Sequence, residues 1–216
     1  MDRRVNESSL VGILDFLRAA ERLKVVTRSA YTSAGDPESV AEHTWRVSLM
    51  AILVARACSE IDVARLLKIC IVHDLGEAVG GDVPAPEQAR RLAAGLPTGK
   101  GADERRHLLT LLQHLTPALR DEIVELWDEY EAAVSPEARL AKGLDKLETL
   151  LQHIQGKNPP DFDYAFNLQY GREHTGSPTL VAALRSLLDQ ETARLAQQLS
   201  ISQDHGESPD GRSASA

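Results

Sequence analysis

Aromatic residues and long apolar runs are scarce in this sequence. Phe, Trp and Tyr together make up only 4% of the 216 residues, whereas β-strands favour aromatic and β-branched side chains. Leu and Ala, which favour helix, dominate the apolar positions instead. Since no apolar stretch approaches the ~18 residues of a membrane span, we expect no contact with a membrane. The chain is therefore predicted to be a soluble all-α protein, with one domain or at most two small ones.

Cysteine and clustered positive charge are also scarce. Cys58 and Cys70 are the only cysteines, and both lie in apolar helical stretches, so we interpret them as small core residues rather than disulfide partners or metal ligands. A reducing, cytoplasmic setting follows as the expectation. The 24 basic and 32 acidic residues give a net charge of −8 without a dense Lys/Arg block. This balance argues against a nucleic-acid polymer as partner but allows a small anionic substrate held by a local cation and a metal ion.

Turn residues and apolar periodicity divide the chain into predicted helices. They cover residues 8–24, 38–58, 61–79, 88–96, 103–115, 116–134, 136–155 and 178–199. We expect Ser8 or Ser9 to cap the first helix, Pro37 or Glu38 to open the second, and Ser135 to cap the one that starts at residue 136. Residues 25–37 and 96–101 are predicted connections. Residues 1–200 are predicted to form a single domain, and the polar residues 201–216 a disordered tail.

An adjacent His73 and Asp74 end an apolar run that starts at Leu66 and is interrupted only by Lys68. A buried ionised carboxylate costs several kcal/mol unless it is paired or coordinated. An Asp–His hydrogen bond in the core is one explanation. However, Glu77 follows His73 by four residues and Asp74 by three, so all three side chains share a helix face. Three such groups in an apolar setting indicate a metal ion with a spare carboxylate beside it.

Other polar residues could join this pair. His43 lies on the apolar face of the helix at residues 38–58, where it is either a core histidine or a ligand from an antiparallel neighbour. Asp145 lies at the edge of a leucine stripe and is either solvated or directed inward, with Lys142 and Lys146 on its flanks. Asp82, in the turn after the third helix, is a turn residue or a site residue. Arg28 is a surface arginine or a substrate contact.

The aromatic residues that the chain does have are concentrated in one segment. Residues 156–177 contain Phe162, Tyr164, Phe166 and Tyr170. These side chains could line a pocket or fill the core beneath a loop. We expect them to pack in the core.

The order of His43, the His73-Asp74 pair and Asp145 resembles the HD-domain metal-dependent phosphohydrolase superfamily. The longer strings resemble its 5′-deoxynucleotidase branch. They are Pro37-Glu-Ser-Val-Ala-Glu-His43, His73-Asp-Leu-Gly-Glu77, Gly81-Asp-Val-Pro84 and Leu126-Trp-Asp-Glu-Tyr-Glu131. The resemblance extends over residues 10–195.

The resemblance implies an all-α HD-domain bundle with one divalent ion between its central helices. The implied metal ligands are His43, His73, Asp74 and Asp145; Glu77 and Asp82 are implied as catalytic, and Arg28 as the contact for substrate phosphate. The implied reaction hydrolyses a (deoxy)nucleoside 5′-monophosphate to nucleoside and phosphate, and the resemblance suggests a homodimer. Where the family often carries Trp after that arginine, this chain has Ser29, Ala30 and then Tyr31, which leaves the choice of sugar and base open.

The chemistry of the donor set agrees with the resemblance. Two His and two Asp side chains suit Mn²⁺, Co²⁺, Fe²⁺, Ni²⁺ or Zn²⁺ better than Ca²⁺, and Mg²⁺ remains compatible. Two alternatives stay open from the sequence. One is an HD phosphohydrolase that acts on another phosphate ester or a pyrophosphate. The other is a non-catalytic module that binds a metal or a nucleotide.

Overall fold

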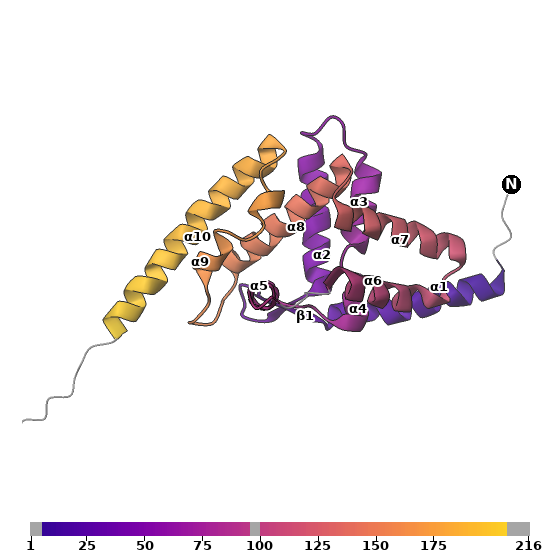
Figure 1. Cartoon of the computed structure of the whole chain (residues 1–216), viewed down its shortest axis with the longest axis horizontal. Coiled ribbons are helices and arrows are strands. Elements are labelled where there is room, and N and C mark those ends of the chain that lie inside the picture. The colour runs from indigo at the N-terminus through magenta and orange to yellow at the C-terminus, as the bar shows by residue number, and fades with distance from the viewer. Residues whose placement is uncertain (1–5, 96–99, 207–216) are drawn as a thin grey trace, which may run out of the picture.

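The computed structural model describes residues 6–95 and 100–206, and it confirms the predicted all-α class (Figure 1). The long helices are α1 (Glu7–Ala20), α2 (Val40–Ala55), α3 (Val63–Val72), α5 (Ala85–Ala93), α6 (Lys100–Leu111), α7 (Pro117–Ala132), α8 (Pro136–Gln155) and α10 (Thr179–Gly206). The short elements are η1 (Glu21–Lys24), β1 (Thr27–Tyr31), β2 (Pro37–Ser39), α4 (Glu77–Gly80), η2 (Leu112–His114), α9 (Tyr164–Asn167) and η3 (Arg172–His174). No helix in this described part is long and apolar enough to cross a membrane.

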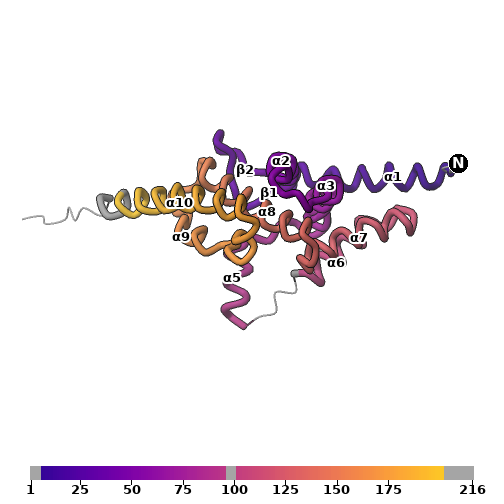
Figure 2. Tube along the Cα trace, turned by 90° about the horizontal axis from the view of Figure 1, so that it is seen from above, coloured from indigo at the N-terminus to yellow at the C-terminus, as the bar shows by residue number. Residues whose placement is uncertain are grey.

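Helices α2, α3 and α8 pack against one another and form the centre of the molecule (Figures 1 and 2). Helix α8 is the most buried of the three, because its leucines recur at helical spacing. Leu140, Leu144 and Leu147 are each at most 1% exposed, as the predicted stripe requires. Each buried leucine contributes about 1.5–3 kcal/mol of transfer free energy. This rigid centre carries the polar residues described below.

Capping residues explain where several helices begin. Ser135 accepts a hydrogen bond from the Ala138 amide at 3.0 Å, and Pro136 follows it, as predicted for α8. The prediction for α1 was wrong, because Asn6, not Ser8 or Ser9, is the cap and accepts from the Ser9 amide. Ser39 caps α2. The second helix therefore begins after Pro37 and Glu38, not at them.

Residues 25–37, predicted as a plain connection, contain a strand of a small antiparallel hairpin. Strand β1 pairs with β2, with Thr27 opposite Ser39 and Tyr31 opposite Pro37. The chain reverses at Gly35, whose φ of +99° suits glycine. A two-stranded sheet is only marginally stable alone, and β1 packs against α8. Such short strands carry little propensity signal, but this one fixes the position of Arg28.

The predicted helix over residues 61–79 is interrupted. Helix α3 ends at Val72, residues 73–76 form turns, and α4 begins at Glu77. The chain passes very close to α6 here, because a Cβ atom on Gly76 would lie 2.8 Å from the carbonyl oxygen of Glu104. Tertiary contact thus overrides the helical pattern. His73 and Asp74 consequently lie at the end of α3 rather than within a continuous helix.

Helix α10 runs along α8 and α9, and its C-terminal end projects beyond the rest of the molecule (Figure 1). It continues to Gly206, so residues 201–206 of the predicted tail belong to this helix. Residues 207–216 of that tail and residues 96–99 of the predicted loop lie outside the described residues. The division into a domain and a tail remains a prediction.

Candidate metal centre and active-site cavity

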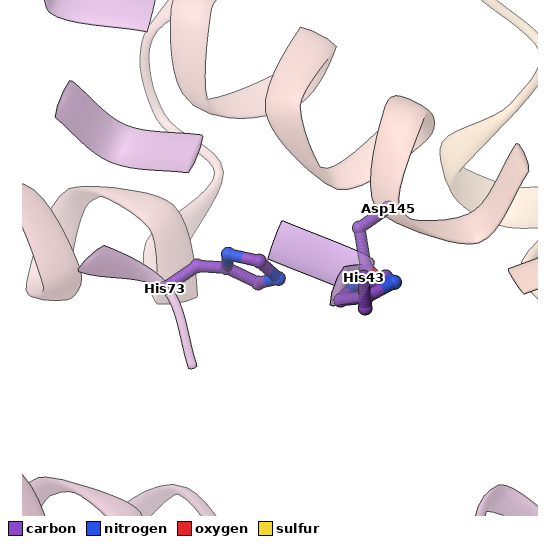
Figure 3. Close-up of side chains that lie close together, drawn as sticks. All are labelled: His43, His73 and Asp145. Carbon is purple, nitrogen blue, oxygen red and sulfur yellow. The ribbon is translucent and has the colours of Figure 1, made fainter. Parts of the chain in front are cut away.

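Three side chains from different central elements meet in a buried cluster. His43 comes from α2, His73 from the end of α3 and Asp145 from α8. One ligand atom from each lies within 4.8 Å of the other two, and all three residues are buried (Figure 3). The Nε2 atom of His43 is 3.3 Å from Oδ1 of Asp145. The packing of α2, α3 and α8 therefore brings together residues that are more than a hundred positions apart.

Asp74 extends this cluster toward solvent. Its Oδ2 atom is 3.1 Å from Nε2 of His73 and 3.6 Å from Nε2 of His43. The Asp74 side chain is 20% exposed, whereas that of His43 is 0% exposed. The structure thus brings together all four side chains that the sequence resemblance implies as ligands, with Asp74 on the open side.

The outer nitrogen of each histidine is occupied by the protein. Nδ1 of His43 donates to the carboxylate of Glu148, and Nδ1 of His73 donates to the carbonyl oxygen of Cys70 at 2.7 Å. Both Nε2 atoms are buried and have no hydrogen-bond partner among the described residues. A metal-bound histidine typically has this arrangement, with one nitrogen hydrogen-bonded and the other left for the ion.

Asp145 is held in a similar way. Its Oδ2 atom accepts hydrogen bonds from the Tyr130 hydroxyl at 2.7 Å and from Lys146 Nζ at 2.9 Å. The Oδ1 atom is the one that faces His43. Two unpartnered imidazole nitrogens beside two carboxylates form a mixed N/O donor set. The residues present therefore fit a divalent transition metal.

The electrostatics of the cluster favour positive charge. Burial raises the pKa of Asp74, but His73 and His43 outweigh it and hold that pKa below its usual range. Burial likewise opposes ionisation of Asp145, but Lys146 and the cluster histidines hold its pKa well below the ordinary value. For His43, burial and a nearby arginine lower the pKa, yet the neighbouring carboxylates raise it to about 9. A cation at this point is stabilised by the ionised carboxylates around it.

A cavity of about 420 Å³ opens beside the cluster. Six of the seven site residues implied by the sequence line it: Arg28, His73, Asp74, Glu77, Asp82 and Asp145. The seventh, His43, is fully buried and completes the cluster from α2. Glu77 is 7% exposed at the start of α4, and Asp82 follows Gly81, whose φ is +76°. Both carboxylates implied as catalytic thus share the cavity with the cluster.

Arg28 projects from β1 into the same cavity. Its Nη2 atom donates to the Thr149 hydroxyl at 2.9 Å, and its Nη1 atom is 4.0 Å from Oδ2 of Asp74. Burial opposes the charge of Arg28, but Glu148, Asp74 and other neighbouring carboxylates raise its pKa further above the ordinary value. The guanidinium is therefore a fixed cation beside the cluster, at the edge of the open space.

Sequence reasoning assigned no role to Lys142 and Lys146, but both line the cavity. Nζ of Lys142 lies 4.2 Å from the ring centroid of Tyr130, and that of Lys146 lies 5.2 Å from the ring centroid of Tyr170. The sequence carried a signal for Lys142, because a residue three positions from an inward Asp145 shares its helix face, but none for Lys146, which follows Asp145 directly. The cavity wall therefore has three cationic side chains among eight carboxylates, so an anionic ligand would bind where these cations and a metal ion at the cluster lie close together.

The aromatic residues of segment 156–177 were expected to pack in the core, but Phe162, Phe166 and Tyr170 line the cavity. Phe162 also packs against the His153 ring, with centroids 4.8 Å apart. The alternative that the sequence left open, a pocket wall, is the one that the structure has. This wall gives the cavity an aromatic side as well as a cationic one.

An all-α bundle with a buried His/Asp cluster at the wall of a cavity lined by charged side chains has the architecture of the metal-dependent phosphohydrolases. The comparisons with known proteins agree. A family model described as "HD domain" matches residues 20–183. The chain belongs to the HD domain family, and the curated relatives it resembles are named 5′-deoxynucleotidases.

Two relatives and one solved structure illustrate the match. The chain is 31% identical to "5′-deoxynucleotidase HDDC2" of Danio rerio, over 85% of this chain and 90% of the relative. It is 32% identical to "5′-deoxynucleotidase hdd1" of Schizosaccharomyces pombe, over 70% of this chain and 75% of the relative. A crystal structure from Magnetospirillum magnetotacticum, described as a "Predicted metal-dependent phosphohydrolase", superposes with a TM-score of 0.75 at 27% identity, covering 88% of this chain and 96% of that one.

Proposed function

We propose that this protein is a metal-dependent 5′-deoxynucleotidase that hydrolyses deoxynucleoside 5′-monophosphates to nucleoside and phosphate. The observation that carries the proposal is the opening of the His/Asp cluster onto a cavity that is also lined by Arg28, Glu77 and Asp82. The names of the relatives support the choice of substrate.

The metal ligands in this proposal are His43, His73, Asp74 and Asp145. They would hold one divalent ion, of which Mn²⁺, Co²⁺, Fe²⁺, Ni²⁺ and Zn²⁺ suit the N/O donors best, with Mg²⁺ also compatible. When bound, such an ion lowers the pKa of a coordinated water and polarises the phosphoryl group. The protein contributes the ligand orientation, for example through the Tyr130 hydroxyl that donates to Asp145.

Arg28 is the proposed phosphate contact. Its planar guanidinium can make two parallel hydrogen bonds to phosphate oxygens, which an ammonium group cannot do. Thr149 already holds one of its nitrogens in place, so little side-chain freedom is lost when substrate binds. Lys142 and Lys146 add positive charge to the same cavity.

Glu77 and Asp82 are the proposed proton-transfer residues. The reaction forms a bond between phosphorus and a water oxygen and breaks the bond to the 5′-oxygen, which leaves as the nucleoside hydroxyl. One proton must be removed from the water and one given to the leaving oxygen. We assign the first transfer to Glu77, because it opens α4 directly after the turn that contains the His73-Asp74 pair, and its side chain lines the cavity. Asp82 would supply the complementary transfer or orient the substrate.

The cellular context is proposed on the family resemblance and on the composition. The resemblance suggests a homodimer, while the few cysteines and short apolar runs favour a cytoplasmic setting for a single domain at residues 1–200. Sedimentation velocity of the full chain at micromolar concentration checks the oligomeric state, and a species with the mass of one chain would contradict it.

Phosphate release from a panel of ribo- and deoxynucleoside 5′-monophosphates tests the activity. Metal-stripped protein is assayed with Mn²⁺, Co²⁺, Mg²⁺ or EDTA, and Asp74→Ala serves as the control. Release from deoxynucleotides that requires metal and is lost in Asp74→Ala is the expected result. No release from any monophosphate, by protein shown to contain metal, would sink the proposal.

A second function is a phosphohydrolase for another phosphate ester or a pyrophosphate. It is favoured by the residues after Arg28, because Ser29, Ala30 and Tyr31 line the cavity where family members often have Trp. The same assay with sugar phosphates and nucleoside triphosphates separates the two. Faster turnover of one of these than of every monophosphate would favour the second function.

A further inference from the structure

Glu148 is a buried carboxylate to which the proposed reaction assigns no chemical step. It is 0% exposed and lies on α8, three residues after Asp145. Its Oε2 atom accepts from Nδ1 of His43, and its Oε1 atom accepts from Nε of Arg46 at 2.7 Å. A buried carboxylate needs such partners, since its desolvation is costly. Arg46 alone would meet much of that need, so the contact with a cluster histidine calls for its own explanation.

The contact determines which nitrogen of His43 is free. A histidine that binds a metal ion must give up the hydrogen of one ring nitrogen, and because Glu148 accepts the hydrogen on Nδ1, Nε2 is the nitrogen that would present its lone pair to the ion. Nε2 is the atom that faces Asp145 at 3.3 Å and Asp74 at 3.6 Å. In the opposite tautomer Nε2 would carry the hydrogen, and His43 would have no lone pair to offer on that side.

The two histidines of the cluster are supported differently. Nδ1 of His73 donates to a neutral backbone carbonyl, that of Cys70. Nδ1 of His43 donates to a carboxylate, which Arg46 in turn fixes through Nε and through a 3.0 Å hydrogen bond from Nη1 to Gln155. A carboxylate makes the imidazole a stronger ligand than a carbonyl does. Of the two histidines, His43 therefore has the stronger hydrogen-bond acceptor at its Nδ1 atom.

We propose that Glu148 is a positioning residue for the metal centre. Through its hydrogen bond to Nδ1 it holds His43 in the tautomer and orientation that present Nε2 to the ion, and it strengthens the ring as a ligand. Arg46 keeps the carboxylate in place from α2. Glu148 would act on metal affinity and not on turnover. Its role can therefore be refuted while the proposed activity is confirmed, and the activity can be refuted while the role is confirmed.

Glu38 provides a matched control within the same polar cluster. It is 2% exposed, and its Oε1 atom is 3.5 Å from Nη2 of Arg46. Its Oε2 atom is 3.7 Å from Nε of Arg28. It thus shares Arg46 with Glu148 and has an oxygen within 4.8 Å of a His43 nitrogen but, in the described part of the chain, makes no hydrogen bond to the His43 ring. Replacing either glutamate by glutamine removes a buried carboxylate, but only Glu148→Gln exchanges the charged acceptor of a ligand's Nδ1 hydrogen for a neutral one.

The test is a titration of metal-stripped protein with Co²⁺ at pH 8, followed by calorimetry and by the visible absorption of bound Co²⁺. We expect Glu148→Gln to weaken Co²⁺ binding roughly 10–100-fold, the range that such outer contacts typically show. We expect Glu38→Gln to change it less than about threefold, well below that range. Wild-type affinity in folded Glu148→Gln, or an equal loss in both variants, would overturn the inference.

A second measurement, on wild-type protein, tests the role of Glu148 even if the Glu148→Gln variant does not fold. In wild-type protein loaded with Zn²⁺ and labelled with ¹⁵N-histidine, the ring of His43 is expected to bind through Nε2 and to keep a hydrogen on Nδ1. That hydrogen should resonate far downfield, because it lies in a charge-assisted hydrogen bond. Coordination through Nδ1, or an Nδ1 without hydrogen, would contradict the role given to Glu148.

Discussion

Removing the carboxylate of Glu77 should slow turnover without loss of bound metal, unlike removing a carboxylate of the cluster. Glu77 lines the cavity but does not belong to the group of side chains whose ligand atoms converge. We expect Glu77→Gln to lower kcat by roughly 10²–10⁴-fold, the usual contribution of a general acid or base, with bound metal unchanged. Phosphate release and metal analysis of the same sample measure both quantities. Glu104→Gln, another glutamate of the cavity wall, is the matched control, and equal losses in both variants would refute a specific role for Glu77.

His153, a buried residue of the cavity wall, should make the free energy of unfolding depend on pH. Burial lowers the pKa of His153 to about 4, from an ordinary value of 6.5. Between these values the unfolded chain binds a proton that the folded chain does not, so the free energy of unfolding falls as pH decreases from about 6.5 toward 4. The full effect is about 3 kcal/mol, from about 1.4 kcal/mol per pKa unit.

Urea unfolding of wild type and His153→Gln across this pH range measures that effect. Since glutamine does not titrate, the difference between the two proteins should grow in favour of the variant as pH decreases. His114→Gln, at an exposed histidine, controls for the replacement of a histidine as such. Parallel pH profiles for wild type and His153→Gln would show that the buried ring makes no such contribution.

At the scale of elements, α10 holds the aromatic side of the cavity in place through Arg185. This arginine has a side chain only 6% exposed. It donates to the carbonyl oxygen of Tyr170 at 2.6 Å and to that of Asn167 at 3.1 Å, while Asp189 accepts from its Nε at 2.7 Å. Segment 156–177 has little regular structure of its own, so these bonds replace the ones that a helix or sheet would supply.

We expect Arg185→Met to lower the free energy of unfolding by about 3 kcal/mol, because it leaves buried carbonyls and a carboxylate without their donor. The looser wall should also raise KM more than it lowers kcat. Urea unfolding and steady-state kinetics measure the two effects, and Arg194→Met, at an exposed arginine of the same helix, is the control. A stable variant with wild-type KM would show that α10 does not support the cavity.

The elements also show what the sequence could and could not predict. Helices with strong periodicity, such as α8, were predicted to the residue, because capping by Ser135 and burial of the leucine stripe agree. The break after Val72 was missed because a close approach to α6 at Gly76 decides it, and such contacts leave no periodic signal. The motif residues of the site were found by resemblance. Lys146 and Glu148 were not, since charged residues beside an interior stripe usually face solvent.

At the scale of the whole molecule, the cluster joins the three central helices, so metal should stabilise the entire fold. Without the ion, Asp74 and Asp145 lie close together among buried groups. An ion that binds only the folded chain adds about 2.7 kcal/mol at a hundred times its Kd, which for a chain of this size is a rise in Tm of about 5–10 °C. Calorimetry of metal-stripped protein with and without Co²⁺ measures it. Asp145→Asn should abolish the rise, and Asp121→Asn, at an aspartate 71% exposed, should retain it. An equal rise in both variants would place the stabilising ion elsewhere.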